Sequence, residues 1–276
     1  MVQKRVLSVQ DISCFGKCSN TVALPVLSAA GFECVILPTA LLSTHTGGFK
    51  GFSFLDLTEE MKKIMTHWKT LPLQLDAVLT GYFGNREQLS FVRQYLLEQG
   101  NLFRFVDPVM GDCGKLYSIY DGDFAAGMRE FCEGADVITP NLTEACLLAG
   151  VSYRGDRAEE NDLHALLRRL SELDIRKIVL TGVRFGAAEI GVVAFDAQTG
   201  RTDTFRTPFA DTYLHGTGDT FASSLCARML QGREFSDAIR DALDFTFASI
   251  QNTLQTDSRY GLIFEPELYR LAKQAL

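Results

Sequence analysis

Short apolar runs recur along the chain, and segments with apolar residues at helical spacing lie between most of them. The apolar runs predict strands at 6–9, 34–37, 77–82, 103–106, 137–139 and 177–180. The helical spacing predicts helices at 22–30, 57–68, 86–98, 159–173, 219–231, 235–254 and 266–275, and a further helix through 146–148. Strands that alternate with helices indicate an α/β fold, with a mainly parallel sheet covered by helices on both faces.

Prolines and glycines modify this pattern near the N-terminus. The strand at 34–37 is expected to end at Pro38, and the polar, glycine-rich segment 39–51 is expected to form a shaped loop. Pro25 conflicts with the helix at 22–30 unless it lies near the first turn or the helix bends there.

The second half of the chain contains one clear hairpin signal. Runs at 190–195 and 201–205 flank a polar turn, which predicts an antiparallel edge on the otherwise parallel sheet. No linker, low-complexity tract or credible repeat divides the chain. We therefore expect a single domain over residues 1–276.

Composition narrows the classes of function. The chain has 276 residues, of which 46% are hydrophobic, and a formal net charge of −7, which argues against nucleic acid or an anionic membrane surface as a partner. The seven cysteines are scattered, with no paired metal spacing, which favours free thiols in a reducing compartment. The N-terminus lacks the apolar core of a signal peptide, and no apolar run is long enough to span a membrane. We expect a cytoplasmic protein.

Polar side chains of useful kinds follow the predicted strands. Ligands in open α/β sheets bind beyond the carboxyl ends of the strands, so these side chains are expected to converge on one rim of the sheet. They are Asp11, His45 and Thr46, Tyr82, Asp107, Asn141 and Glu144, Thr181, and the residues from Gly216 to Asp219.

The segment from Gly216 to Asp219 carries the most specific chemistry. Gly216 and Gly218 let an anion approach the main chain, and unpaired amides at the start of the following helix would attract it. Asp219 would repel a bound phosphate, but it suits proton removal beside amides that stabilise charge on a transferred group. This combination indicates phosphoryl transfer. The alternative is a glycine turn with Asp219 as an ordinary residue of the first helical turn.

Two acidic clusters suggest a metal site. Asp107 and Asp112 flank a rigid turn and would suit Mg²⁺ beside a nucleotide, although such a carboxylate more often caps a loop. Asn141 and Glu144 have the spacing of a capping box, which the sequence alone favours. In the functional alternative, Glu144 faces inward and orders metal-bound water.

The histidines and Cys113 allow weaker hypotheses. His45 either hydrogen-bonds a substrate or braces its loop, and His215 either contacts phosphate or lies solvated in a loop. Cys113 lies in a glycine-bearing segment, 111–117, that could close as a lid. The dinucleotide-binding and P-loop glycine patterns are both absent from the sequence.

Six motifs together resemble a known family. They are Leu-Ser-Val-Gln at 7–10, Ser-Thr-His-Thr-Gly at 43–47, Leu-Thr-Gly-Tyr at 79–82, Asp-Pro-Val-Met-Gly-Asp at 107–112, Thr-Pro-Asn-Leu-Thr-Glu at 139–144 and Gly-Thr-Gly-Asp at 216–219. In this order they resemble the ribokinase-like superfamily and, within it, the vitamin B6 (pyridoxal/pyridoxamine) kinases. The resemblance implies the three-layer ribokinase-like fold and ATP-dependent phosphorylation of a hydroxymethyl group.

The resemblance also implies residue roles. Asp219 would be the general base, and Gly216, Thr217 and Gly218 would form the anion hole for the γ-phosphate. Segment 112–117 would be the lid. The nucleotide would be bound by Asp107, Asn141, Thr181 and Gly218, and Mg²⁺ by Asp107 and Glu144. The substrate would be bound by Asp11, Ala40, Leu42, His45, Thr46 and Tyr82.

The cofactors implied are ATP and Mg²⁺, with K⁺ as a candidate monovalent ion, and the subgroup commonly forms homodimers. One departure concerns the substrate. B6 kinases usually carry serine followed by histidine after the first strand, whereas this chain has Asp11-Ile12, as in the related hydroxymethylpyrimidine kinases. Asp11 could pair with a protonated ring nitrogen or accept from an aminopyrimidine, so both substrates stay open. A non-catalytic B6-phosphate or nucleotide binding protein is the alternative of another class.

Overall fold

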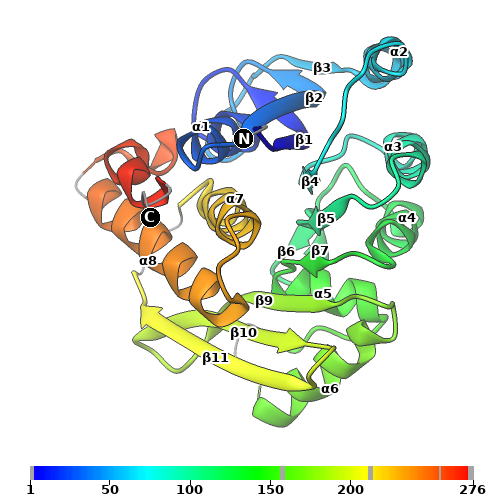
Figure 1. Ribbon diagram of the computed structural model, residues 1–276. Coiled ribbons are helices and arrows are strands. Elements are labelled where there is room, and N and C mark those ends of the chain that lie inside the picture. Colours follow the sequence, from blue (N-terminus) through cyan, green and yellow to red (C-terminus); the bar gives the residue numbers. More distant parts are fainter. Residues whose placement is uncertain (1–2, 156–158, 211–213, 255, 273–276) are drawn as a thin grey trace. The chain divides into compact units, whose positions relative to one another are not determined.

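The computed structural model describes residues 3–155, 159–210, 214–254 and 256–272. The chain divides into two compact units, which are coloured along the sequence in Figure 1. Unit 1 comprises Met1–Gly84 and Asp211–Leu276, and unit 2 comprises Asn85–Ala210. Unit 1 contains both ends of the sequence, so the predicted anion hole and the predicted substrate residues fall in the same unit.

Four strands of unit 1 form a mainly parallel arrangement in the order β4-β1-β2-β3. They are β1 (Arg5–Ser13), β2 (Glu33–Leu42), β3 (Phe54–Asp56) and β4 (Ala77–Thr80). β1 pairs in parallel with β2 and β4, and β3 runs antiparallel to β2. Val6, Leu7 and Val9 of the central strand β1 are completely buried, which explains its nearly continuous apolar run.

The helices of unit 1 are α1 (Asn20–Ala29), α2 (Thr58–Trp68), α7 (Thr217–Leu230) and α8 (Phe235–Thr253), with 3-10 helices η1 (Ser258–Tyr260) and η2 (Glu265–Leu271). α7 packs against both α1 and α8. Its middle, from Thr220 to Ala227, is buried throughout, and small residues such as Ala222 and Ser223 allow that close packing. The helix that begins at the predicted anion hole is therefore a rigid internal element.

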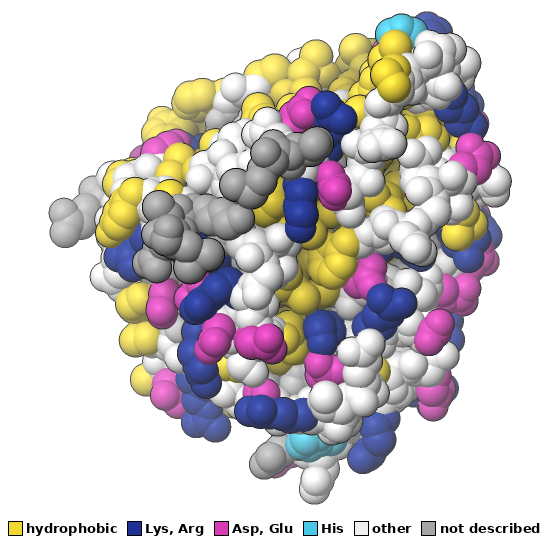
Figure 2. All heavy atoms as spheres, in the orientation of Figure 1, with side chains coloured by type: hydrophobic (Ala, Val, Ile, Leu, Met, Phe, Trp, Pro, Cys, Tyr) yellow, Lys and Arg dark blue, Asp and Glu magenta, His cyan; other side chains and the backbone are white. Residues whose placement is uncertain are grey.

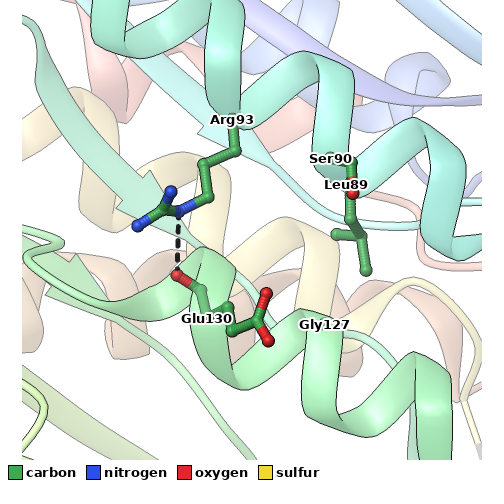
Figure 3. Close-up of a pocket in the computed structure, with 5 residues that line it drawn as sticks. All are labelled: Leu89, Ser90, Arg93, Gly127 and Glu130. Carbon is green, nitrogen blue, oxygen red and sulfur yellow. Dashed lines mark hydrogen bonds between the residues drawn. The ribbon is translucent and has the colours of Figure 1, made fainter.

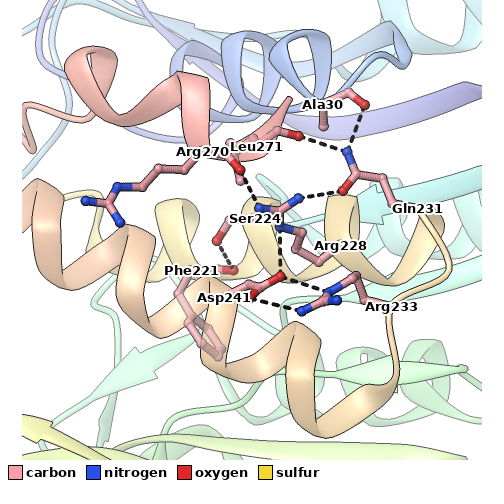
Figure 4. A network of polar contacts seen from close by, with 9 residues as sticks. All are labelled: Ala30, Phe221, Ser224, Arg228, Gln231, Arg233, Asp241, Arg270 and Leu271. Carbon is pink, nitrogen blue, oxygen red and sulfur yellow. Dashed lines mark hydrogen bonds and ion pairs between the residues drawn. The ribbon is translucent and has the colours of Figure 1, made fainter. Parts of the chain in front are cut away.

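A polar network fixes the far end of α7 (Figure 4). The carboxylate of Asp241 on α8 contacts Arg228 Nε at 3.2 Å and Arg233 Nε at 3.1 Å. Gln231 Nε2 donates to the carbonyl oxygens of Ala30 at 3.1 Å and Leu271 at 2.9 Å. α7 is thus tied at this end to α8, to the end of α1 and to η2.

Unit 2 continues the parallel pattern and ends in the predicted hairpin. Its strand order is β11-β10-β9-β8-β5, with β5, β8 and β9 parallel and β9, β10 and β11 antiparallel. The strands are β5 (Phe103–Val106), β8 (Val137–Ile138), β9 (Lys177–Arg184), β10 (Glu189–Asp196) and β11 (Arg201–Pro208). The mainly parallel sheet with an antiparallel edge is confirmed.

Four helices and a small hairpin complete unit 2: α3 (Arg86–Glu98), α4 (Gly122–Cys132), α5 (Leu142–Ala149), α6 (Glu160–Ser171), and the strands β6 (Gly111–Asp112) and β7 (Lys115–Leu116). Side-chain caps start two helices. Asn85 accepts from the N–H of Gln88, and Asp121 accepts from the N–H of Phe124.

One boundary prediction was wrong. β2 does not end at Pro38 but continues to Leu42, so the first residues of the expected loop are strand. Pro38 is tolerated because it pairs opposite Gln10, where the β1–β2 register shifts, and because β3 pairs with β2 only from Ala40 onward. Its missing N–H therefore faces an unpaired stretch of edge.

Other differences are local. Pro25 lies inside α1 beyond the first turn. The predicted C-terminal helix is a 3-10 helix over Glu265–Leu271, and its last expected residues lie outside the described part. α4, β3 and the β6–β7 hairpin were not predicted, because their apolar segments are short or contain glycines.

The described part of the chain contains no helix long and apolar enough to cross a membrane. On the face seen in Figure 2, basic and acidic side chains alternate over the surface. That face therefore presents mixed charge, in keeping with the acidic balance of the sequence.

Candidate active site

The start of α7 has the geometry expected for an anion hole. Gly216, the N-cap, has φ 80°, and a Cβ at this position would lie 2.4 Å from the carbonyl oxygen of Lys17. No side chain caps the helix, because the N-cap residue is a glycine, and the Thr217 hydroxyl donates to the carbonyl of Leu214 at 2.9 Å. The first amides of α7 are therefore left for an anion, with the positive end of the helix dipole behind them.

Asp219 lies in the first turn of α7 and is half-buried. Its carboxylate accepts from the Cys18 thiol, with Sγ 3.3 Å from Oδ2, and from the backbone N–H of Ser19. Burial raises the pKa of Asp219, while the Ser19 N–H, the Cys18 thiol and His45 act in the opposite direction. A carboxylate with a raised pKa is a stronger base than an exposed one.

Asp11, near the end of β1, is connected to the same group of residues. It is buried, and its Oδ2 accepts from the Ser13 hydroxyl at 2.9 Å. Burial raises its pKa to about 6, against the hydrogen bonds from the Ser19 and Ser13 hydroxyls, and the charge of Asp219 raises it further. Asp11 and Asp219, 208 positions apart in the sequence, therefore lie close enough to influence each other.

Ala40 and Leu42 lie on β2 and are both buried. They share one face of the sheet, because alternate residues of a strand point the same way, and Leu42 pairs with Ser13 of β1. Thr46 is exposed in the loop that follows, and Tyr82, after β4, is partly buried with its carbonyl bonded to Thr39. The structure thus places Leu42 opposite Ser13, whose hydroxyl donates to Asp11.

His45 braces its loop. Gly47 N donates to Nδ1 at 3.2 Å, which assigns the proton to Nε2, and Nε2 lies 2.8 Å from the carbonyl oxygen of Arg259. The His45 ring lies 4.7 Å from that of His215, and a Cβ at Gly47 would lie 1.7 Å from His215 Cε1. Both ring nitrogens of His45 are engaged, so the bracing interpretation is favoured, and a direct contact with substrate stays a prediction.

In unit 2, Asn141 and Glu144 form a complete capping box at the start of α5, as the spacing predicted. Glu144 also accepts from the backbone N–H of Met110 at 3.1 Å, and the Asn141 amide donates to the carbonyl of Gly111 at 2.9 Å. These bonds fasten the segment after β5 to α5. Burial raises the pKa of Glu144 to about 8 despite its backbone donors.

The end of β8 adds a further oxygen. The N–H of Thr139 donates to the carbonyl of Val106, which places Thr139 beside the strand end that carries Asp107. The Thr139 hydroxyl is buried and has no hydrogen-bond partner. Within the described residues no three His, Cys, Asp or Glu side chains converge on a metal position. Asp107, Glu144 and Thr139 nevertheless offer only oxygen donors, which suits Mg²⁺ that keeps several of its waters.

The predicted lid is the β6–β7 hairpin. Asp112 caps its turn by accepting from the N–H of Cys113, and Gly114 N donates to the Thr143 hydroxyl at 2.8 Å. Cys113 is exposed and has φ 51°. Thr181 of β9 donates its N–H to the carbonyl of Pro140, beside Asn141.

A small pocket of about 110 Å³ lies elsewhere in unit 2, between α3 and α4 (Figure 3). Arg93 lines it and donates to the carbonyl of Glu130 at 3.1 Å. None of the predicted site residues lines this pocket.

Comparison with known proteins identifies the class of enzyme. The phosphomethylpyrimidine kinase family model matches residues 24–263. The chain belongs to this family. It is accordingly a kinase, a phosphotransferase with an alcohol group as acceptor, and its fold is ribokinase-like.

Solved structures resemble this kinase over nearly its whole length. A Bacteroides thetaiotaomicron VPI-5482 protein, provisionally assigned as a phosphomethylpyrimidine kinase and crystallised with pyridoxal, is 36% identical, with a TM-score of 0.93, and the match covers 98% of this chain and 96% of that one. The pyridoxal kinase of Lactobacillus plantarum is 31% identical, with a TM-score of 0.91 and coverage of 98% and 97%.

Curated relatives carry both substrate names. A pyridoxine/pyridoxal/pyridoxamine kinase of Bordetella avium (strain 197N) is 29% identical over 92% of this chain and 86% of its own length. A hydroxymethylpyrimidine/phosphomethylpyrimidine kinase of Staphylococcus aureus (strain Mu50 / ATCC 700699) is 28% identical over 67% of this chain and 64% of its own length.

Sequence reasoning gave no role to three residues of this kinase that the structure places in its candidate site: Cys18, Ser19 and the Thr139 hydroxyl. A serine directly before a helix is typical of an N-cap, and this pattern conceals the different use of Ser19. Nothing in the sequence links Cys18 to Asp219, because they are 201 positions apart.

Proposed function

We propose that this kinase transfers the γ-phosphoryl group of ATP to the 5′-hydroxymethyl group of a B6 vitamer (pyridoxal, pyridoxamine or pyridoxine) in pyridoxal phosphate salvage. The observation that carries the proposal is the likeness, over nearly the whole chain, to a protein crystallised with pyridoxal and to a pyridoxal kinase. A relative named as a hydroxymethylpyrimidine/phosphomethylpyrimidine kinase has a similar identity of 28%, and the matching family model carries the phosphomethylpyrimidine kinase name, so that substrate is kept as the alternative.

Asp11 is the proposed contact for the substrate ring. It is buried, as are Ala40 and Leu42 on the neighbouring strand, and a pKa of about 6 leaves it mainly ionised at neutral pH. A buried carboxylate favours a cationic partner, and the protonated nitrogen of a pyridine ring supplies one. An aminopyrimidine could donate to the same carboxylate, so hydroxymethylpyrimidine (phosphate) is the alternative substrate.

Asp219 is the proposed base for the acceptor hydroxyl. Its raised pKa suits removal of the proton as the oxygen attacks phosphorus, and the amides of Gly216, Thr217 and Gly218 would stabilise the charge on the transferred group. Each such donor contributes about 3–4 kcal/mol to transition-state stabilisation in enzymes where it has been removed. Because they share the first turn of α7, the base and the hole are held in fixed relation.

Nucleotide contacts are proposed for residues of unit 2. We propose that Asp107, Asn141 and Thr181 contact ATP, whose use is supported by ADP in a structure of the 26% identical Leishmania donovani pyridoxal kinase with pyridoxamine. Asp107 and Glu144 would hold Mg²⁺, with the unpartnered Thr139 hydroxyl beside them. The ion would neutralise charge on the phosphates, and K⁺ is proposed as a further activating ion.

We further propose a cytoplasmic homodimer whose single domain spans residues 1–276. The edge strand β3 supports self-association, because Phe54 and Leu55 on it are about half exposed, at 48% and 57%. Exposed apolar side chains on a sheet edge are typical of an interface. Light scattering of the purified chain would measure the mass directly, and a monomer at micromolar concentration would contradict the dimer.

The substrate assignment is tested by a panel. ADP release is measured with pyridoxal, pyridoxamine, pyridoxine and hydroxymethylpyrimidine, each with Mg²⁺ and with or without K⁺. We expect turnover of at least one vitamer at a higher kcat/KM than the pyrimidine. Strong turnover of the pyrimidine alone would replace the B6 assignment by the alternative, and tight vitamer binding without ADP release would indicate a binding protein.

A further inference from the structure

Ser19 departs from the usual behaviour of a serine before a helix. It occupies the N-cap position of α1, yet it makes no side-chain cap hydrogen bond, and its backbone has φ 50° and ψ −124°. An N-cap serine normally has extended backbone and bonds an amide of the first turn. A non-glycine residue at such a φ costs about 1–3 kcal/mol, and this strain is typically found where it serves a function.

The unusual conformation serves two carboxylates. The Ser19 hydroxyl lowers the pKa of Asp11, and the Ser19 backbone N–H lowers the pKa of Asp219, so both groups stabilise the ionised carboxylates. Ser19 is buried, so neither donor is exchanged freely with water. A single residue thus acts on both the proposed ring-binding carboxylate and the proposed base.

Cys18 supplies a second donor to Asp219, with its Sγ 3.3 Å from Oδ2. The Ser19 Oγ lies 3.9 Å from the same sulfur. Burial and the charges of Asp219 and Asp11 raise the pKa of the Cys18 thiol well above its usual range, so the sulfur keeps its proton. A protonated thiol can only donate to a neighbouring carboxylate, which fixes the direction of this bond.

The backbone around Cys18 is held in place. Thr21 Oγ1 accepts from the N–H of Cys18 at 3.1 Å and donates to its carbonyl at 2.7 Å. Ser19 forms a bridge with Ile12 of β1. Both donors therefore come from a fixed turn, and their positions do not depend on a flexible loop.

We propose that Cys18 and Ser19 are positioning residues: Cys18 orients Asp219 by donating to its carboxylate, and Ser19, which lies against the Cys18 sulfur, connects this contact to Asp11. The inference rests on the proposed role of Asp219 as base. It adds two residues that do not touch the transferred group and act through the carboxylates.

The groups that act on Asp219 define the expected pH behaviour. They are the Cys18 thiol, the Ser19 N–H and His45, and Asp219 in turn raises the pKa of Asp11. A donor to the ionised form of a carboxylate lowers its pKa, so removal of the thiol raises the pKa of Asp219. The acidic limb of the kcat profile, which reports the ionisation of the base, must then move to higher pH.

The test compares Cys18→Ala, Cys18→Ser and Ser19→Gly with the control Cys14→Ala, an exposed cysteine of the same loop. Cys18→Ala should lower kcat about five- to tenfold, as expected for one lost hydrogen bond, with KM for ATP unchanged and the acidic limb shifted upward. Cys18→Ser keeps a donor and should recover most of the activity. Ser19→Gly suits the positive φ and keeps the N–H but loses the hydroxyl to Asp11, so it should mainly raise KM for the acceptor.

The outcomes separate this inference from the proposed function. The assay uses whichever acceptor the substrate panel identifies, so a change of acceptor leaves it intact. Wild-type kcat and an unmoved limb in Cys18→Ala would overturn the positioning role, and so would Cys18→Ser if it were as defective as Cys18→Ala, since the sulfur would then act only by packing. Should Cys18→Ala fail to fold, Cys18→Ser and Ser19→Gly carry the test.

Discussion

Replacing Gly216 by alanine should damage both the fold and the anion hole. Gly216 has φ 80°, and the added Cβ would lie 2.4 Å from the carbonyl oxygen of Lys17. An L-residue in the left-handed region costs about 1–2 kcal/mol. Forcing an atom into a packed site costs about 1–3 kcal/mol more. Lys17 cannot retreat easily, because its own N–H donates to the carbonyl of Tyr260.

Two glycines of the same helix region separate these effects. Gly232, beyond the end of α7, has φ 86° with nothing within 4 Å of an added Cβ, so its alanine variant carries only the conformational cost. Gly218 is a helical residue with open space, so alanine there should be neutral or stabilise by up to about 1 kcal/mol. We expect Gly216→Ala to lose about 2–5 kcal/mol in total.

Urea unfolding of the three variants measures these differences in stability. The kcat of folded Gly216→Ala measures the effect of the substitution on the proposed anion hole. A shift of the first amides should lower kcat by about a hundredfold, the usual effect of losing one such donor. If Gly216→Ala were as stable as Gly232→Ala, the close approach to the Lys17 carbonyl would add no steric cost and would not constrain the start of the helix.

Two further predictions concern charge. Asp241→Ala should lower the free energy of unfolding in urea by about 1–3 kcal/mol, because it leaves the poorly exposed Arg228 without its carboxylate. The control Asp237→Ala, on the same helix, breaks an exposed ion pair and should cost less than about 1 kcal/mol. Equal losses of stability in the two variants would contradict the role of the network. Asp11 has a pKa raised from 3.8 to about 6, so the folded state binds its proton more tightly than the unfolded state, and its ionisation removes stability as pH rises through that interval. The stability of Asp11→Asn relative to wild type should therefore increase by up to about 3 kcal/mol between pH 4 and pH 7, and a flat difference would contradict the assigned burial.

The sequence predicted the elements whose stability is local. The helix at Arg86–Glu98 begins at a side-chain cap, the hairpin of β10 and β11 has a polar turn, and the capping box of Asn141 and Glu144 follows from residue spacing. Each of these features depends on residues within a few positions of one another, so composition and spacing suffice to find them.

Features that depend on partners distant in the sequence could not be predicted from the sequence alone. β2 continues through Pro38 because of the way in which β1 and β3 pair with it, and only the order of strands in the sheet reveals this pairing. His45 is braced by Arg259, 214 positions away, and Ser19 turns away from its helix toward two carboxylates. The sequence shows which polar residues follow the strands, but not the hydrogen bonds that assign His45 to bracing and Asn141 and Glu144 to capping.

If Asp219 removes the proton from the hydroxymethyl group of a B6 vitamer, the products formed from ATP and pyridoxal must depend on this carboxylate. Phosphorus NMR can follow those products with the wild-type protein and with Asp219→Ala. We predict pyridoxal 5′-phosphate in equal amount to ADP for wild type, and no turnover but largely unchanged nucleotide binding for the variant. Near-normal kcat in Asp219→Ala, or ADP without a phosphorylated vitamer, would contradict the claim.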